Sequence, residues 1–367
     1  MKYIFILGNN PELSLAEIMA VRPDLKLLKN NNFYALFEGK IEDGRQLINR
    51  LGGTIKIGLW LGERPEVGPI LGSASSQTGT SRFIFGLSFY AQKPNSWGIK
   101  IKKILKERGV SSRLVVSRES ALSSVIVTKE KCHDFLISPD FFGLTVAVQD
   151  FKDYGRRDRG RPKADALSGM LPTKLAKIMI NLARVETGAV ILDPFCGSGT
   201  ILTEALALGY TNLIGSDISA KAVSDSQENL QWLTEELGIK DYELRIFEND
   251  VKSLALKIKD QSVEAIVTEP YLGQPIKGNE NESTIKKIIA GLDDLYLASF
   301  QEFKKIIKSG GCLVVVLPQW HLKEKIYNLN IISQLADLGF SRQDQGNLLY
   351  RREDQKVWRQ ITIWRKE

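Results

Sequence analysis

The chain has 367 residues, more than one hydrophobic core usually organises, so its length predicts two or three domains. It is 43% hydrophobic and 25% charged, as ordinary globular proteins are, and no apolar run approaches the roughly 18 residues that a membrane-spanning helix needs. The formal net charge is +7, but residues 1–163 carry 26 Lys and Arg against 16 Asp and Glu, whereas residues 164–367 carry 24 against 27. Because Lys and Arg replace the cations condensed on phosphates, this uneven charge predicts that the N-terminal half meets a polyanion; a basic surface that serves only solubility is the alternative.

The N-terminus, the cysteines and the histidines exclude several other classes. The N-terminal MKYIFILGNNPELS has too short an apolar run for a signal peptide. Cys132, Cys196 and Cys312 are far apart and form no CxxC pair, and His133 and His321 are equally isolated. We therefore expect no disulfide framework, no metal and no membrane association, and we expect a cytoplasmic protein. The sequence leaves the oligomeric state open, with a monomer as one option.

Residues 1–150 predict two small α+β units in succession. Residues 1–55 have the pattern strand, helix, strand, helix, with Pro11 and Ser14 typical of a helix start and Gly39 and Gly52 typical of element ends. Residues 56–150 predict strands around one helix at residues 96–109, and residues 123–129 are among the expected strands. In that helix five basic side chains surround an apolar stripe, which fits a nucleic-acid contact and a solvated face equally well.

Residues 151–172 predict a linker with a run of positive charge. The segment FKDYGRRDRGRPKADALSGMLP contains three glycines, two prolines and six basic residues. Its four arginines lie near Tyr154 and suit contacts with phosphates and stacked bases, so we predict that they bind RNA; a flexible tether is the alternative. The four are Arg156, Arg157, Arg159 and Arg161.

From residue 173 onward, short apolar runs alternate with helical patterns. This alternation predicts a parallel sheet with helices on both faces. Helices are expected at about residues 285–308 and 322–338, among others. The last two apolar segments, NLLYRRE and WRQITIWRKE, predict an antiparallel hairpin at the edge of the sheet.

The strongest local signal is the segment ILDPFCGSGTILTEA. Asp193 ends an apolar strand, Gly197 and Gly199 occupy the turn, and Thr200 starts a helix. Ligands of doubly wound sheets bind at such strand ends, where glycines let the backbone approach closely and the helix N-terminus offers unpaired N–H groups. The turn is therefore predicted to hold a ligand.

The surrounding residues narrow the choice of ligand. The turn lacks the Gly-Lys-Ser/Thr of a P-loop, and Leu202 stands where the dinucleotide fingerprint has its third glycine. Asp217 ends the next strand, where a carboxylate can bind paired ribose hydroxyls. Asn249 and Asp250 follow the third strand, where a carboxylate can accept from an adenine amino group. A ligand with adenosine and an amino-acid tail but no phosphates satisfies these points, and S-adenosyl-L-methionine is such a ligand. The alternatives are a helix cap at Asp217 and an exposed turn at Asn249 and Asp250.

These motifs carry a resemblance to a known family. Residues 193–200 resemble the cofactor motif of class I methyltransferases, and GMLPTKLAKIMINLA at residues 169–183 resembles the segment before it in RNA guanine-N2 methyltransferases. With GNNPELSLAEI near the N-terminus and RGVSSRLVVSRESALSSVIV at residues 108–127, nearly the whole chain resembles the THUMP-containing tRNA guanosine N2-methyltransferases that act on position 10.

The resemblance implies an α/β fold class and an order of domains. It implies a ferredoxin-like domain at residues 1–55, a THUMP RNA-binding domain at 56–150, a basic linker at 151–172 and a class I Rossmann-like methyltransferase domain at 173–367. The implied cofactor residues are Asp193, Phe195, Gly197, Gly199, Thr200, Asp217, Asn249 and Asp250.

The segment IVTEPYLG, residues 266–273, stands where the family holds the target amine. The exocyclic amine of guanine is a weak nucleophile because its lone pair is delocalised, so acceptors must bind its N–H groups and orient that lone pair. In the family an Asp-Pro-Pro-Tyr motif does this, and its aromatic ring stacks on the flipped base. This chain departs from the motif, and either Thr268 or Glu269 can take the acid position. We expect Glu269, Pro270 and Tyr271 to be the catalytic residues, with a different target amine or an inactive domain as alternatives.

The sequence thus predicts a tRNA (guanine-N2)-methyltransferase that uses S-adenosyl-L-methionine and has tRNA as its partner. A DNA amino-methylase is a second hypothesis, because the cofactor and amine motifs would serve it too. An RNA-binding protein with an impaired methyltransferase domain is a third.

Overall fold

The computed structural model describes residues 1–75, 82–163, 170–322, 325–344, 346, 348–351 and 355–367. The chain divides into two compact units, Met1–Asp153 and Tyr154–Glu367. The predicted linker therefore lies mostly in the second unit, and its residues 164–169 are outside the described residues.

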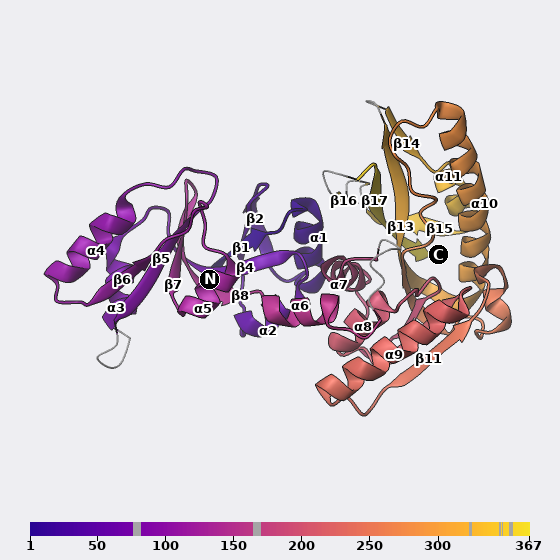
Figure 1. Ribbon diagram of the computed structural model, residues 1–367, viewed down its shortest axis with the longest axis horizontal. Coiled ribbons are helices and arrows are strands. Elements are labelled where there is room, and N and C mark those ends of the chain that lie inside the picture. The colour runs from indigo at the N-terminus through magenta and orange to yellow at the C-terminus, as the bar shows by residue number, and fades with distance from the viewer. Residues whose placement is uncertain (76–81, 164–169, 323–324, 345, 347, 352–354) are drawn as a thin grey trace. The chain divides into compact units, whose positions relative to one another are not determined.

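The N-terminal unit is built on one mixed sheet (Figure 1). Its described strands pair in the order β2-β3-β1-β4-β8-β7-β5-β6. The elements are β1 (Lys2–Leu7), α1 (Pro11–Val21), β2 (Lys26–Asn30), β3 (Tyr34–Glu38), α2 (Gly44–Arg50), β4 (Thr54–Gly62), α3 (Val67–Ser75), β5 (Phe83–Phe89), α4 (Trp97–Glu107), β6 (Ser112–Val115), α5 (Ser124–Glu130), β7 (His133–Ser138) and β8 (Phe141–Val148). Because β4 is paired with both β1 and β8, the boundary expected between residues 55 and 56 falls inside a strand.

Two predictions in this part of the chain are wrong. Residues 124–130 form helix α5 and not a strand, although the segment is rich in β-branched residues. The Ser123 hydroxyl caps this helix by accepting from the Ile126 N–H at 3.3 Å, and Lys131 ends it in a left-handed conformation with φ of 49°. A cap and a tertiary contact of Val127 thus outweigh the local strand preference.

The first part of the predicted linker is also helical. Helix α6 spans Phe151–Arg159, and its first N–H groups, those of Lys152 and Asp153, donate to the Asp150 carboxylate at 3.0 and 3.1 Å. Tyr154 and Arg157 of this helix are buried. Residues 151–159 are therefore not a flexible tether.

The C-terminal unit is an α/β fold. Its strands follow the order β11-β10-β9-β12-β13-β17-β15, with β14 paired to β13 and β16 to β17. The elements are α7 (Thr173–Leu182), β9 (Val190–Asp193), α8 (Thr200–Ala207), β10 (Asn212–Asp217), α9 (Ala220–Leu237), β11 (Glu243–Glu248), η1 (Val251–Leu256), β12 (Val263–Thr268), α10 (Glu282–Ile306), β13 (Ile307–Leu322), β14 (Lys325–Asn328), α11 (Ile332–Asp337), β15 (Phe340–Arg342), β16 (Leu349–Tyr350) and β17 (Val357–Lys366).

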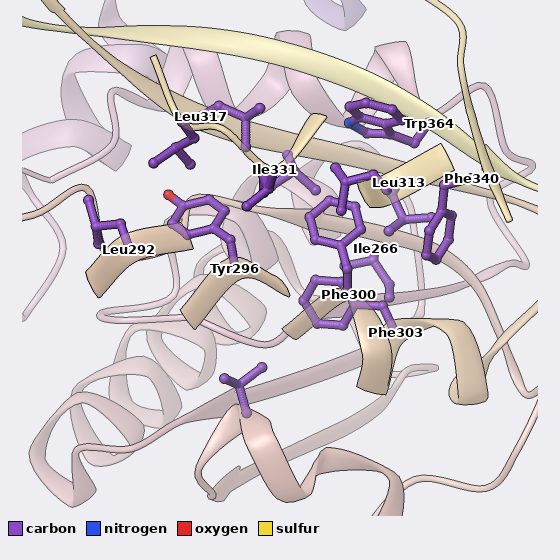
Figure 2. Packing of buried hydrophobic residues seen from close by; sticks show 14 of the residues in the cluster. Ile266, Leu292, Tyr296, Phe300, Phe303, Leu313, Leu317, Ile331, Phe340 and Trp364 are labelled. Carbon is purple, nitrogen blue, oxygen red and sulfur yellow. The ribbon is translucent and has the colours of Figure 1, made fainter. Parts of the chain in front are cut away.

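Strands β9 to β13 pair in parallel, which confirms the predicted sheet. Helix α10 packs a buried stripe, which includes Leu292, Tyr296, Phe300 and Phe303, against this sheet (Figure 2). On the other side of the sheet, a Cβ at Gly215 would lie only 2.6 Å from a methyl group of Leu202 in α8. Helices therefore cover both faces, and the carboxyl ends of β9, β10 and β12 meet at one edge.

The C-terminal prediction is only partly right. Residues 322–338 do not form one helix, because β13 continues to Leu322 and is followed by β14 and the short α11. The predicted hairpin exists between β16 and β17, but β17 lies between β13 and β15 and not at the edge. None of the helices in the described part of the chain is long and apolar enough to span a membrane.

Candidate active site

The turn between β9 and α8 is held by its own backbone and by Asp217. Gly197 and Gly199 have φ values of 50° and 83°, which glycine adopts without strain. The Cys196 N–H donates to the Ser216 carbonyl at 2.9 Å, and the Gly197 N–H donates to Asp217 Oδ2 at 3.0 Å. The turn is therefore fixed against the end of β10.

A cavity of about 750 Å³ opens at this turn. Seven of the eight predicted cofactor residues line it, and so do all three predicted catalytic residues. These ten residues are Asp193, Phe195, Gly197, Thr200, Asp217, Asn249, Asp250, Glu269, Pro270 and Tyr271. The volume is within the range of small-molecule sites, roughly 300–1,000 Å³.

Gly199 lies outside the set of residues that line the cavity. A Cβ at this position would come within 2.4 Å of the Ser226 hydroxyl on α9, and the φ of 83° disfavours other residues. Gly199 therefore allows α8 and α9 to pack closely at the start of α8.

Asp193 is buried beneath the cavity floor, with 2% of its surface exposed. Its Oδ1 accepts from the Thr268 hydroxyl at 2.7 Å and from the Phe195 N–H at 3.2 Å. Burial raises the pKa of this carboxyl to about 7, although both hydrogen bonds act in the opposite direction. The nearby charges of Asp217 and Glu269 also raise the pKa.

The predicted residues after β11 are close to Asp217. The Asn249 N–H donates to the Asp217 carbonyl at 2.9 Å. Asp250 caps η1 by accepting from the Lys252 N–H at 3.0 Å. The two side chains thus lie at the cavity wall next to the end of β10.

The turn after β12 gives Thr268 and Glu269 different surroundings. Thr268 is fully buried and donates its hydroxyl to Asp193, whereas Glu269 lines the cavity. This arrangement favours Glu269 for the acid position. Tyr271 is 58% exposed at the cavity, and its carbonyl accepts from the Tyr296 hydroxyl of α10 at 3.3 Å.

Glu269 has a partner that the sequence analysis missed. Arg359 of β17 also lines the cavity, and its Nε donates to Glu269 Oε1 at 2.5 Å while Nη2 donates to Oε2 at 3.3 Å. Burial raises the pKa of the Glu269 carboxyl, and the positive charge of Arg359 offsets part of that rise. The sequence carries no signal for this pair, because the two residues are 90 positions apart and the register of β17 cannot be derived from its composition.

Two of the four predicted RNA-binding arginines have structural partners instead. Arg157 is 4% exposed and donates its Nε to Glu204 Oε1 at 2.6 Å, and Arg161 is equally buried and donates to the Thr200 hydroxyl at 2.8 Å. Buried guanidinium groups that neutralise a buried carboxylate or hold a helix start do not reach a phosphate, so the RNA prediction is corrected for these two residues. Arg156 is partly exposed and pairs with Glu236 at 2.6 Å, and Arg159 is exposed.

Comparison with known proteins assigns the chain to a family. A family model described as an RMKL-like methyltransferase domain matches residues 161–337, and one described as a DNA methylase matches residues 87–228. A Methanothermococcus thermolithotrophicus protein named "Probable tRNA (guanine(10)-N2)-dimethyltransferase" is 40% identical over 114 residues, which are 30% of this chain and 67% of that protein. This chain belongs to the family of the tRNA (guanine(10)-N2)-dimethyltransferases.

A second relative extends the match to more of the chain. The tRNA (guanine(10)-N2)-dimethyltransferase of Methanocaldococcus jannaschii is 28% identical over 238 residues, which are 61% of this chain and 62% of that protein. The match thus spans less than two thirds of this relative's length. The crystal structure of TrmN from Thermus thermophilus covers the whole of both chains with a TM-score of 0.54 at 15% identity, which shows that the fold is a methyltransferase-like α/β fold.

Proposed function

We propose that the chain is an S-adenosyl-L-methionine-dependent RNA methyltransferase that acts on the exocyclic N2 of a guanosine in tRNA, of the position-10 type. The observation that carries this proposal is the shared cavity. One space is lined both by the glycine turn after β9 and by the Glu269-Pro270-Tyr271 turn after β12. The names of the two family relatives support the choice of guanine N2 and of tRNA.

The residues on the cofactor side of the cavity fit the proposed ligand. Both oxygens of Asp217 accept from backbone N–H groups, those of Gly197 and Ser219, and a carboxylate oxygen still has a second acceptor position for a ribose hydroxyl. Helix α8 begins at Thr200, where its first N–H groups suit the carboxylate of an amino acid. When bound, S-adenosyl-L-methionine supplies an electrophilic methyl group.

The residues on the other side would hold the base. The carboxylate of Glu269 and the carbonyl of Pro270 would accept from the N–H groups of the target amine and direct its lone pair into the cavity. The exposed ring of Tyr271 would stack on the flipped base. Thr268 supports this turn from below through Asp193.

We propose that the N-terminal half binds the tRNA, with a ferredoxin-like part and a THUMP part that meet within strand β4. The excess of basic residues in residues 1–163 supports this role, and the exposed Arg159 would add a phosphate contact. The three cysteines, which are free and buried, support a reducing compartment, and we propose the cytoplasm.

The test is a methyl-transfer assay with the purified full chain, labelled S-adenosyl-L-methionine and either unmodified tRNA or duplex DNA. We expect label in tRNA, and mass spectrometry of the digested nucleosides should give N2-methylguanosine or its dimethyl form. Label in DNA alone would favour an amino-methylase, the candidate that the match to the DNA methylase model supports. Cofactor binding without label in either substrate would contradict both enzymatic functions and leave an RNA-binding protein.

A further inference from the structure

The ion pair at the methylation site joins two distant parts of the sheet. Glu269 follows β12, and Arg359 is on β17, with β13 between these strands. The two side chains are 15% and 8% exposed, and both line the cavity beside Pro270. A negative acceptor and a positive donor therefore lie next to each other where the target base would be held.

The pair has hydrogen-bonding capacity for a ligand. A carboxylate has about four acceptor positions and a guanidinium has five N–H donors, so the contacts between Glu269 and Arg359 leave acceptor positions on the carboxylate. Guanine presents two neighbouring donors, its exocyclic amine and N1–H, followed by the acceptor O6. Adenine presents one donor beside the acceptor N1. A carboxylate next to a guanidinium matches the guanine pattern at all three positions, and arginine is the usual partner of guanine O6.

We propose that Glu269 and Arg359 together recognise guanine, with the carboxylate accepting from N1–H and the exocyclic amine and the guanidinium donating to O6. This inference rests on the proposed function, because it concerns the base at the same site. It makes Arg359 a specificity-determining residue and gives the glutamate a reason to replace the shorter aspartate of the family motif, since its longer side chain reaches a partner on β17.

The test compares tRNA transcripts that differ only at the target nucleotide, position 10. They carry guanosine, inosine or 2,6-diaminopurine riboside there, each opposite an abasic nucleotide so that no base loses a pairing partner. Affinities are measured with the full chain saturated with S-adenosylhomocysteine. Inosine keeps O6 and N1–H but lacks the exocyclic amine, so it should bind more weakly than guanosine. 2,6-Diaminopurine keeps that amine but reverses the groups at N1 and C6, and it should bind about 10- to 100-fold more weakly than guanosine.

Variants then assign this preference to the pair. Arg359→Gln should lower the ratio of guanosine to 2,6-diaminopurine affinity several-fold, because it removes the charged donor to O6 while Glu269 still discriminates at N1. Arg365→Gln is the matched control, since Arg365 is also on β17 but is exposed and donates to the Gly310 carbonyl at 2.8 Å. Loss of Arg359 leaves the buried charge of Glu269 without this partner, so the double variant Glu269→Gln/Arg359→Gln is measured as a neutral pair. The affinity for S-adenosylhomocysteine reports whether each variant is folded.

Two results would overturn the inference. One is a wild-type protein that binds the 2,6-diaminopurine transcript as tightly as the guanosine transcript. The other is an Arg359→Gln variant that is folded and keeps the wild-type ratio, in which case the pair only links β12 to β17. Failure of the proposed function is a different result, the absence of methyl transfer to the guanosine transcript, and the affinity ratios are measured independently of transfer.

Discussion

Asp193 illustrates how one buried acid links stability to ligand binding. Its pKa in the folded protein is about 7, chiefly because of burial, whereas an aspartate in an unfolded chain titrates near pH ~4. The folded state therefore binds the proton more tightly than the unfolded state does. The contribution of Asp193 to the free energy of unfolding is fully present at pH values below its unfolded pKa. It is lost as the pH rises from about 4 through 7.

The variant Asp193→Asn should remove this pH dependence. Asparagine keeps an oxygen acceptor for Thr268 and the Phe195 N–H but cannot ionise. Wild-type stability relative to the variant should fall by up to about 4 kcal/mol between pH 4 and 8, since one unit of pKa corresponds to about 1.4 kcal/mol. Urea denaturation at several pH values measures this difference. Asp241→Asn, an exposed substitution, is the control.

The same substitution should weaken cofactor binding although it raises stability at high pH. If Asp193 contributes its charge to the cofactor site, Asp193→Asn should be more stable than the wild type at pH 8 but bind S-adenosylhomocysteine more weakly. Parallel curves of stability against pH for the variant and the wild type would contradict the raised pKa of Asp193.

At the scale of elements, the sequence predicted those whose signal is local and periodic. Strands β9, β10 and β12 followed from short apolar runs that end at Asp193, Asp217 and Thr268, and their site residues converge because parallel strands end at one edge. Helix α5 was missed because its β-branched composition favours a strand. Helix α6 was missed because glycines and charges suggest a loop, although its Arg157 is buried against Glu204. Arg359 could not be found at all, since its position depends on the pairing of β17 with β13.

The contact between α6 and α8 should be costly to break. Glu204 of α8 is fully buried and pairs with Arg157 at 2.6 Å and with Lys177 of α7 at 3.9 Å. Glu204→Gln removes the buried carboxylate that both ion pairs share, so we expect it to lower the free energy of unfolding by about 3–5 kcal/mol. Arg156→Gln removes the half-exposed pair with Glu236 and should cost less than about 1 kcal/mol.

Urea denaturation of the full chain compares the two variants. A Glu204→Gln protein as stable as the Arg156→Gln protein would mean that the buried pair contributes little net stability. In that case α6 would be held mainly by the packing of Tyr154.

At the scale of the whole molecule, the excess of positive charge and the cavity residues lie in different parts of the sequence. The positive excess lies entirely in residues 1–163, whereas the cavity and all proposed catalytic and cofactor residues are in the C-terminal unit. Helix α4 contributes strongly to this excess. Its lysines 100, 102, 103 and 106 are exposed, while Ile101 and Leu105 are buried. RNA affinity and cofactor affinity should therefore respond to different substitutions.

Replacing the four α4 lysines with glutamine tests whether this helix contacts RNA. Each lysine that neutralises a phosphate contributes about 0.7–0.9 to the slope of log affinity against log salt concentration, so the slope for tRNA should become shallower by up to about 3. S-adenosylhomocysteine affinity should not change. The control changes four exposed lysines of the C-terminal unit, Lys240, Lys257, Lys259 and Lys287, and has the same net charge. If both sets alter the slope equally, tRNA binding depends on total charge, and α4 is a solvated face without a specific contact.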